Sequence, residues 1–281
     1  SAAVSKKDLL SHRKNGHIHL LPAGWCRACD LTKRQRKAVR RKVSDYVDQL
    51  VDVVATDLAG PLTPSLQNFI YLQLWLNLGN RDIIPTFCPS KHAKHTRANL
   101  KEYVKLRGKP KVLKCDNGRE FLGVFLDELI SMGIQVRNSP GWLPNLNGGV
   151  EVCNRLVLQG AACLLYDAGC SVEHWPSAVK FYCYTLNRVP RPALNNRSSF
   201  EVRTGRVPNN SHFQPFFQEG YYLHPNPDYK SKKPEFEPRR RSCRLLSYSF
   251  SKRSYQVWDT DWGTIETTYD VVWSQAQLPG P

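Results

Sequence analysis

The sequence predicts an α/β fold in which a mixed sheet is flanked by helices. Two β-prone apolar runs, ending near residues 57 and 115, alternate with stretches in which apolar residues recur at helical spacing. This alternation from about residue 50 to 190 favours a layered α/β structure. After residue 221 the sequence pattern changes to short β-prone runs between clusters of Pro, Lys and Arg. This pattern predicts a separate β-rich C-terminal domain.

The first strand is predicted from the apolar run over residues 51–57. Gly60 and Pro61 follow closely and are expected to end it. Asp57 is therefore expected at or near the end of a strand.

A second strand is predicted over residues 111–115, and the turn-forming triplet from Asp116 to Gly118 follows it. Apolar residues then recur at helical spacing from Leu122 to Ile130. Asp116 is thus expected to leave its strand just before a helix begins.

A third acidic residue, Glu151, follows a Pro- and Gly-rich loop over residues 140–149. Apolar residues at helical spacing come next, so Glu151 is expected in the first turns of a helix. The helical pattern continues to about residue 190, where Pro190 and Pro192 break it.

Asp57, Asp116 and Glu151 together predict a divalent-metal site for phosphoryl transfer. Mg²⁺ prefers oxygen ligands and is usually held by one or two carboxylates. Two such ions about 4 Å apart can activate the attacking oxygen and stabilise the leaving one. Each acid taken alone is as well explained as a solvated turn residue, so the prediction depends on all three motifs jointly.

The N-terminal segment carries a candidate zinc site. Cys26 and Cys29 form the only close pair among nine cysteines, and His12, His17 and His19 lie just upstream. Because no βαβ pattern surrounds the pair, a mononuclear site of two Cys and two His is favoured over a redox pair. His17 with either His12 or His19 would complete it. The alternative is a set of solvent-exposed histidines beside an unmetallated pair, and the other cysteines are expected to be buried free thiols.

The charge balance predicts a polyanionic partner. The net charge is +16 over 281 residues, and Lys or Arg side chains that neutralise phosphates release condensed counterions. No apolar run approaches the roughly 18 residues of a membrane-spanning helix, so a membrane role is not expected. The only methionine is the internal Met132, which indicates a chain processed from a polyprotein or a fragment of one. A basic connector supplies candidate phosphate contacts at Lys33, Arg34, Arg36, Lys37, Arg40, Arg41 and Lys42.

The C-terminal runs predict a small β-barrel. Strands are expected over residues 244–248, 255–258, 264–269 and 271–273. Aromatic residues there either stack bases beside a nucleic-acid backbone or fill the interior of the barrel, with the basic residues as its solvated rim. The basic residues in question are Arg239, Arg240, Arg241, Lys252 and Arg253.

Several motifs resemble the catalytic core of retroviral-type integrases, an RNase H-like fold with an Asp-Asp-Glu triad. The resemblance lies in residues 56–61, 115–121 and 139–155, and it places the triad on Asp57, Asp116 and Glu151. Further motifs over residues 174–179, 185–190, 200–208 and 269–273 are similar to the integrase segment of copia-type retrotransposon polyproteins.

The resemblance implies a retrotransposon integrase, a polynucleotidyl transferase that carries out metal-dependent 3′-end processing and strand transfer for DNA integration. It implies two Mg²⁺ or Mn²⁺ ions, one structural Zn²⁺, double-stranded DNA (element ends and target) as partner, and a homo-oligomer on that DNA. Asn147, Asn154 and Arg155 would then contact DNA. The expected location is the nucleus, preceded by a cytoplasmic element particle. The alternatives are an RNase H-like nuclease and a catalytically dead nucleic-acid-binding remnant.

The domain organisation that follows has four parts. Residues 1–32 would form the zinc module and 33–48 the basic connector. Residues 49–215 would form the catalytic core, and 216–281 the C-terminal DNA-binding domain.

Overall fold

The computed structural model describes residues 52–116, 118–138, 148–224 and 239–274. The chain divides into two compact units between residues 209 and 210, and each is described by itself. The predicted zinc module, its ligands His12, His17, His19, Cys26 and Cys29, the basic connector and Asn147 lie outside the described residues. The borders between the four predicted parts stay predictions.

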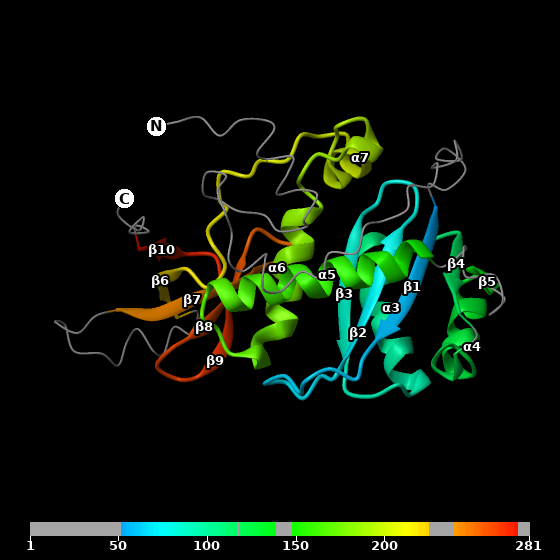
Figure 1. Cartoon of the computed structure of the whole chain (residues 1–281), viewed down its shortest axis with the longest axis horizontal. Helices are drawn as coiled ribbons and strands as arrows, with labels where there is room; N and C mark the ends of the chain where they lie inside the picture. The colour runs from blue at the N-terminus through cyan, green and yellow to red at the C-terminus, as the bar shows by residue number, and fades with distance from the viewer. Residues whose placement is uncertain (1–51, 117, 139–147, 225–238, 275–281) are drawn as a thin grey trace. The chain divides into compact units, whose positions relative to one another are not determined.

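The first unit is built on a five-stranded mixed sheet with strand order β3-β2-β1-β4-β5 (Figure 1). Strands β1 (Val53–Ala59), β2 (Tyr71–Asn77) and β3 (Ile83–Cys88) form an antiparallel meander. Strands β4 (Val112–Cys115) and β5 (Gln135–Asn138) then continue the sheet in parallel with β1. The mixed sheet expected from the sequence is therefore confirmed.

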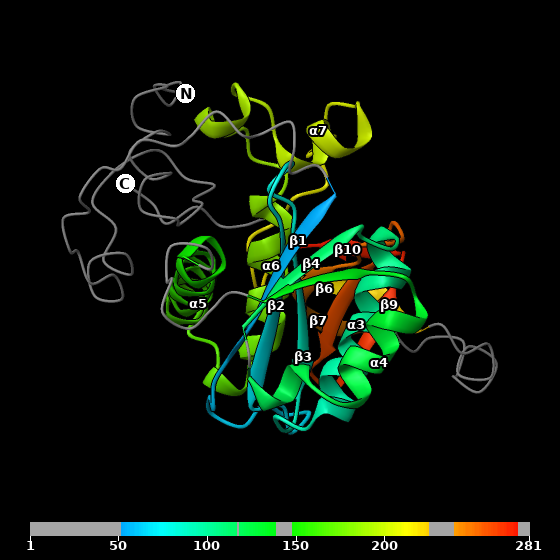
Figure 2. The same cartoon turned by 90° about the vertical axis from the view of Figure 1, so that its right-hand side faces the viewer.

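Helices cover both faces of this sheet (Figure 2). Helix α5 (Gly148–Asp167) packs on β1 and β2, and α6 (Trp175–Leu186) packs on β3 and on α5. On the other face, α3 (Ala93–Arg107) packs on β2 and β3, and α4 (Val124–Ser131) packs on α3 and β5. The short helix α7 (Ser199–Thr204) follows, capped by the Ser198 hydroxyl. Three 3₁₀ turns, η2 (Arg119–Phe121), η4 (Val172–His174) and η5 (Pro192–Leu194), complete the unit's described helical elements.

The core of the first unit explains why these segments fold together. The β2 side chains Leu72, Leu74 and Trp75 are fully buried, as expected of a central strand that is covered by helices on both faces. Each such side chain contributes about 1.5–3 kcal/mol on burial. Trp75 stacks on Tyr103 of α3 with ring centroids 4.9 Å apart, so α3 is fixed against the sheet by an aromatic pair.

The second unit holds a five-stranded antiparallel sheet with order β10-β6-β7-β8-β9. Its strands are β6 (Glu219–Leu223), β7 (Arg240–Tyr248), β8 (Tyr255–Asp259), β9 (Thr264–Thr268) and β10 (Val271–Trp273). The described part of the second unit is thus β-rich, whereas the C-terminal domain over residues 216–281 stays a prediction. Within the described strands the end strands β9 and β10 are not paired with each other, so closure into a barrel stays a prediction. No described helix is long and apolar enough to span a bilayer.

Candidate active site

Two of the predicted acids are brought together by strand register. Strands β1 and β4 run parallel, with Val53 opposite Val112 and Ala55 opposite Lys114. Continuing the same offset by two residues places Asp116 opposite Asp57. Neighbouring strands lie about 4.8 Å apart, and residues in register point to the same face. This register places the two carboxylates side by side, just beyond the last pair of the parallel ladder, Ala55 with Lys114.

Asp57 is held in place by two hydrogen bonds. Its Oδ1 accepts from the backbone N–H of Leu58 at 2.9 Å, and its Oδ2 accepts from the side-chain amide of Asn154 at 2.7 Å. Asn154 lies on α5, so the second bond ties that helix to the end of β1. Each carboxylate oxygen keeps a further lone pair for another ligand.

Helix α5 supplies the third acid to the same place. Glu151 is in its first turn and precedes Asn154 by three residues, a spacing that puts both on one face of a helix. Burial raises the pKa of Asp57, and the charges of Asp116 and Glu151 raise it further, whereas the hydrogen bonds from Leu58 and Asn154 lower it. Asp57 thus lies within electrostatic range of both other acids.

The turn after β4 is compact around Asp116. The N–H of Gly118 donates to the Asp116 Oδ1 at 3.0 Å. A Cβ at Gly118 would lie 3.0 Å from that oxygen and 2.8 Å from the Oε2 of Glu120, so a larger residue there would require the two carboxylates to shift. Thr96 fixes the next residues by donating to the Glu120 carbonyl at 2.6 Å. The position of the Glu120 carboxylate near Asp116 could not be read from the sequence.

The donor set fits a divalent cation in its chemistry. Carboxylates at the ends of two parallel strands and in the first turn of a helix are the oxygen ligands that Mg²⁺ and Mn²⁺ accept. Among the residues that the structure describes, no three His, Cys, Asp or Glu side chains already form a group that could hold an ion. The observation that favours a cation is the crowding of negative charge around half-buried Asp57, which a cation would relieve.

The structure places Asn154 differently from the prediction. It was predicted to contact DNA, but its side chain is 6% exposed and its amide donates to Asp57. Its role is therefore to position an acid. Arg155, the next residue, is exposed, and its contact with DNA stays a prediction.

The basic residues of the second unit also separate into two kinds. Arg241 is 5% exposed, and its guanidinium donates to both carboxylate oxygens of buried Asp259, at 2.5 and 2.7 Å. It therefore stabilises the sheet and does not serve as the predicted phosphate contact, because strand alternation turns it inward. Arg240 pairs with Asp270 at 3.3 Å. Arg239, Lys252 and Arg253 are exposed.

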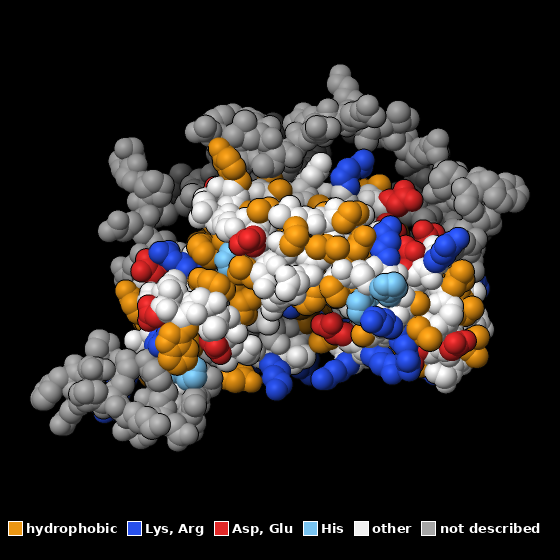
Figure 3. All heavy atoms as spheres, turned by 90° about the horizontal axis from the view of Figure 1, so that it is seen from below, with side chains coloured by type: hydrophobic (Ala, Val, Ile, Leu, Met, Phe, Trp, Pro, Cys, Tyr) orange, Lys and Arg blue, Asp and Glu red, His pale blue; other side chains and the backbone are white. Residues whose placement is uncertain are grey.

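A basic face that sequence reasoning missed lies on α3. Lys and Arg side chains gather beside His side chains on one face of the molecule (Figure 3). The start of α3 supplies both kinds, and no acid is present in its first turn. Glu128 pairs with Arg97 at 2.6 Å and with Lys101 at 3.4 Å. The exposed basic side chains of this α3 face are Lys91, His92, Lys94, Arg97 and Lys101.

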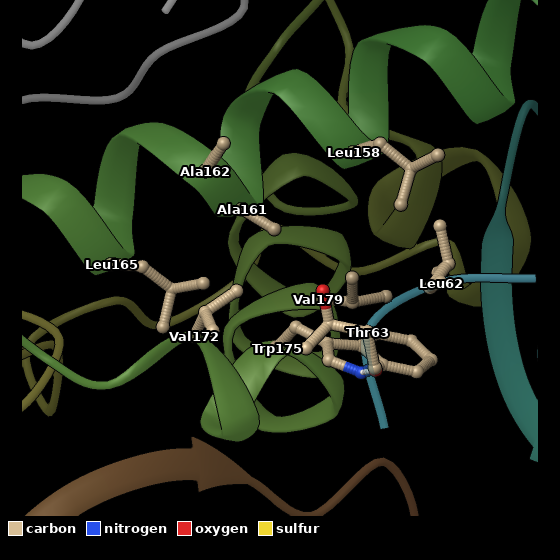
Figure 4. Close-up of a pocket in the computed structure, with 9 residues that line it drawn as sticks. All are labelled: Leu62, Thr63, Leu158, Ala161, Ala162, Leu165, Val172, Trp175 and Val179. Atoms are coloured by element: carbon tan, nitrogen blue, oxygen red, sulfur yellow. Dashed lines mark hydrogen bonds between the residues drawn. The ribbon is translucent and has the colours of Figure 1, made fainter. Parts of the chain in front are cut away.

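An apolar cavity of about 150 Å³ lies between α5, α6 and the segment after β1 (Figure 4). Trp175 forms one wall, and its indole N–H donates to the Thr63 carbonyl at 2.8 Å. No charged side chain lines the cavity, so it is chemically separate from the acidic site. The remaining lining residues are Leu62, Leu158, Ala161, Ala162, Leu165, Val172 and Val179.

Comparison with known proteins identifies relatives of this chain among retrovirus-related Pol polyproteins. The retrovirus-related Pol polyprotein from transposon RE2 of Arabidopsis thaliana is 29% identical over 168 residues, which cover 59% of this chain and 11% of that polyprotein. The one from transposon TNT 1-94 of Nicotiana tabacum is 23% identical and covers 98% of this chain and 20% of its own length. This chain thus spans a fifth or less of these curated relatives. The predicted relationship to copia-type retrotransposon polyproteins is confirmed.

No protein-family model matches the chain. Among solved structures, the chain is similar to the integrase catalytic core domain of HTLV-2 in complex with magnesium, with a TM-score of 0.46 and 17% identity. That likeness covers 54% of this chain and 96% of the other.

Proposed function

We propose that this chain is the integrase segment of a retrotransposon Pol polyprotein, a polynucleotidyl transferase that processes DNA 3′ ends and joins them to target DNA. One observation carries the proposal, and it is made in a relative of Pol polyproteins. The parallel register of β1 and β4 places Asp116 opposite Asp57. Asn154 of α5, the helix that bears Glu151, donates a hydrogen bond to Asp57. This is an arrangement for phosphodiester chemistry.

The residues would act as follows. Divalent cations, Mg²⁺ or Mn²⁺, would activate the attacking oxygen and stabilise the leaving oxygen when bound. Asp57 and Asp116 would be the shared ligands, and Glu151 would complete the set. Asn154 holds the Asp57 carboxylate in one orientation through its 2.7 Å hydrogen bond. Exposed Glu151 has room to accept the proton of a water or a DNA 3′-hydroxyl.

Double-stranded DNA is the proposed substrate, as element ends and as target. The net charge of +16 and the basic α3 face support this, because phosphate contacts supply most of non-specific DNA affinity. A homo-oligomer on DNA, a structural zinc in the N-terminal segment and a nuclear location, preceded by a cytoplasmic particle, belong to the same proposal.

The test is a strand-transfer assay with the purified chain, a labelled duplex carrying the element's ends, and Mg²⁺ or Mn²⁺. Asp116→Asn should abolish cleavage and joining, while DNA affinity changes by no more than a few-fold, since affinity comes mainly from Lys and Arg. Asp127→Asn is the matched control, because Asp127 is an exposed aspartate on neighbouring α4.

The outcomes separate the candidate functions. Joining by the wild-type chain and by Asp127→Asn, but not by Asp116→Asn, supports the integrase. Cleavage without joining would identify a nuclease of the same site chemistry. DNA binding with neither reaction would identify a non-catalytic remnant.

A further inference from the structure

Two arginines lie within 4 Å of a single buried carboxylate in the first unit, apart from the proposed catalytic acids, and a third contacts the same aromatic ring as one of them. Asp82, which immediately precedes β3, is 4% exposed. Its Oδ2 accepts from the Nε of Arg107, at the end of α3, at 2.5 Å. The Nε of Arg203, on α7, lies 3.9 Å from the other oxygen. Arg188, just after α6, is electrostatically coupled to the same three residues. We call Asp82, Arg107, Arg188 and Arg203 the Asp82 cluster.

The two outer arginines are held in defined positions. The Arg188 guanidinium lies 3.4 Å from the ring centroid of Tyr184 and 4.9 Å from that of Phe200. The guanidinium of Arg203 lies 5.5 Å from the same Phe200 ring. Both cations therefore stack against one aromatic side chain, which fixes their planes and lowers the entropy lost on binding an anion.

The backbone around the cluster is also fixed. The side-chain amide of Asn187 accepts from the Ile83 N–H at 2.9 Å and donates to the Ile83 carbonyl at 2.8 Å. The Ser199 hydroxyl donates to the Arg81 carbonyl at 3.0 Å. The end of α6 and the start of α7 are thereby tied to the β2–β3 turn, which carries Asp82.

The charges within the cluster do not balance. Among the residues that the structure describes, Asp82 is the carboxylate whose charge acts on both Arg188 and Arg203, and it is already bonded to Arg107. Burial lowers the pKa of both arginines, and the charge of Arg107 lowers each further. Arg188 donates one hydrogen bond, to the Tyr184 carbonyl, and Arg203 donates none within the part of the chain that the structure describes. Arg188 is half-buried and Arg203 is exposed, so an anion in solution can reach the N–H donors that these two guanidinium groups do not use.

We propose that Arg188 and Arg203 bind a phosphate group, and that in the full reaction this is a backbone phosphodiester of duplex DNA. Planar guanidinium groups offer paired N–H donors that match phosphate oxygens. The first part of the proposal stands on the cluster alone. The second part rests on the proposed function, because it takes DNA as the partner.

The test compares Arg203→Gln with Arg206→Gln in the full chain. Arg206 is an exposed arginine three residues further on and lies outside the cluster, so the control removes the same charge nearby. Inorganic phosphate binding would be measured by calorimetry at constant ionic strength. Arg203→Gln should lose about tenfold in phosphate affinity, whereas Arg206→Gln should match the wild type. Arg188→Lys, which keeps the charge but removes the planar donor pair, should weaken binding as well.

The second arm uses duplex DNA and fluorescence anisotropy at several salt concentrations. Arg203→Gln should reduce the log–log salt slope by about 0.9, the value for one phosphate that is no longer neutralised, and Arg206→Gln should not. If Arg203→Gln weakens phosphate binding but leaves the salt dependence of DNA binding unchanged, the phosphate site is supported, and DNA is refuted as the molecule that supplies the phosphate. Equal phosphate affinity in Arg203→Gln, Arg188→Lys and the wild type would overturn the site. A chain that binds phosphate but no DNA would sink the proposed function and leave the site standing.

Discussion

At the scale of single residues, burial and the contact with Asn154 act in opposite directions on the protonation of Asp57. Burial has already raised the pKa of Asp57, so this carboxyl takes up a proton at a higher pH than an ordinary aspartate does. The amide of Asn154 opposes the rise, because it stabilises the ionised form that a cation requires.

Asn154→Ala should therefore move the acid side of the activity profile to higher pH. Loss of the amide raises the pKa of Asp57 further, so at each pH on the acid limb a larger share of the chain carries a protonated Asp57. At neutral pH the rate should fall by roughly tenfold or more, because a hydrogen bond to a charged group is worth about 1.5–3 kcal/mol. The measurement is strand transfer between about pH 5 and 8 at fixed Mg²⁺. Arg155→Ala is the control, because it alters the adjacent exposed residue and should leave the acid limb of the profile where it is in the wild type. If the acid limb of Asn154→Ala coincided with that of the wild type, Asn154 would not act on the pKa of Asp57.

Arg241 shows what a buried arginine contributes in the second unit. Burial alone would raise the pKa of Asp259, but the hydrogen bonds from Arg241, Tyr222 and the Trp262 N–H outweigh it and hold the pKa at about 2. Because this value lies below the ordinary one, Asp259 contributes stability that is fully present above about pH 4 and is lost as the pH falls through about 2.

Arg241→Gln should destabilise the second unit by about 3–5 kcal/mol, because it leaves a buried carboxylate without its partner. The pKa of Asp259 should rise at the same time, so the loss of stability on acidification should begin at a higher pH. Arg240→Gln is the control, since its pair with Asp270 is exposed and worth no more than about 1 kcal/mol. Urea unfolding at several pH values would decide, and equal midpoints for the two variants would contradict a structural role for Arg241.

At the scale of elements, the close packing of α5 on α6 determines where Glu151 and Asn154 lie. Gly160 of α5 faces Tyr182 of α6, and a Cβ at Gly160 would lie 2.3 Å from atoms of that ring. Tyr182 is 1% exposed and has no space to withdraw. The glycine therefore permits an approach that any larger residue would prevent.

Gly160→Ala should cost about 1–3 kcal/mol of stability, as overpacking does in a filled core. It should also lower strand transfer, because α5 must move relative to β1. Gly149→Ala in the first turn of the same helix meets nothing within 4 Å and should be neutral or stabilise by up to about 1 kcal/mol. Thermal unfolding of both variants is the check, and a Gly160→Ala protein as stable as Gly149→Ala would exclude the close approach.

Element positions were largely predictable because their signals are local. The apolar run before Asp57, the strand before Asp116 and the helix after Glu151 correspond to β1, β4 and α5. The side chains that act across elements were not predictable. Asn154 reads as a polar surface residue of a helix, and only the packing of α5 on β1 reveals its partner. In the same way, a run of three arginines does not say which of them strand alternation turns toward Asp259.

At the scale of the whole molecule, both units offer exposed basic side chains to a polyanion. The second unit presents Arg239, Lys252 and Arg253, and the α3 face of the first presents Lys91, Lys94 and Lys101. The two sets carry equal charge, so replacing either with glutamine changes the net charge by the same amount. A difference between the two variants must therefore come from where DNA lies and cannot come from net charge.

The triple replacement of Arg239, Lys252 and Arg253 should weaken duplex binding and flatten its salt dependence, by about 0.9 in log–log slope for each phosphate that the variant no longer neutralises. The dense cluster of positive charge in the C-terminal segment favours this outcome. Fluorescence anisotropy between about 50 and 200 mM salt covers the range in which proteins that bind many phosphates lose most affinity, and circular dichroism would confirm that both variants are folded. If only the α3 variant flattens the salt dependence of binding, the DNA lies along α3. The basic residues of the second unit would then be solvated and would not contact DNA.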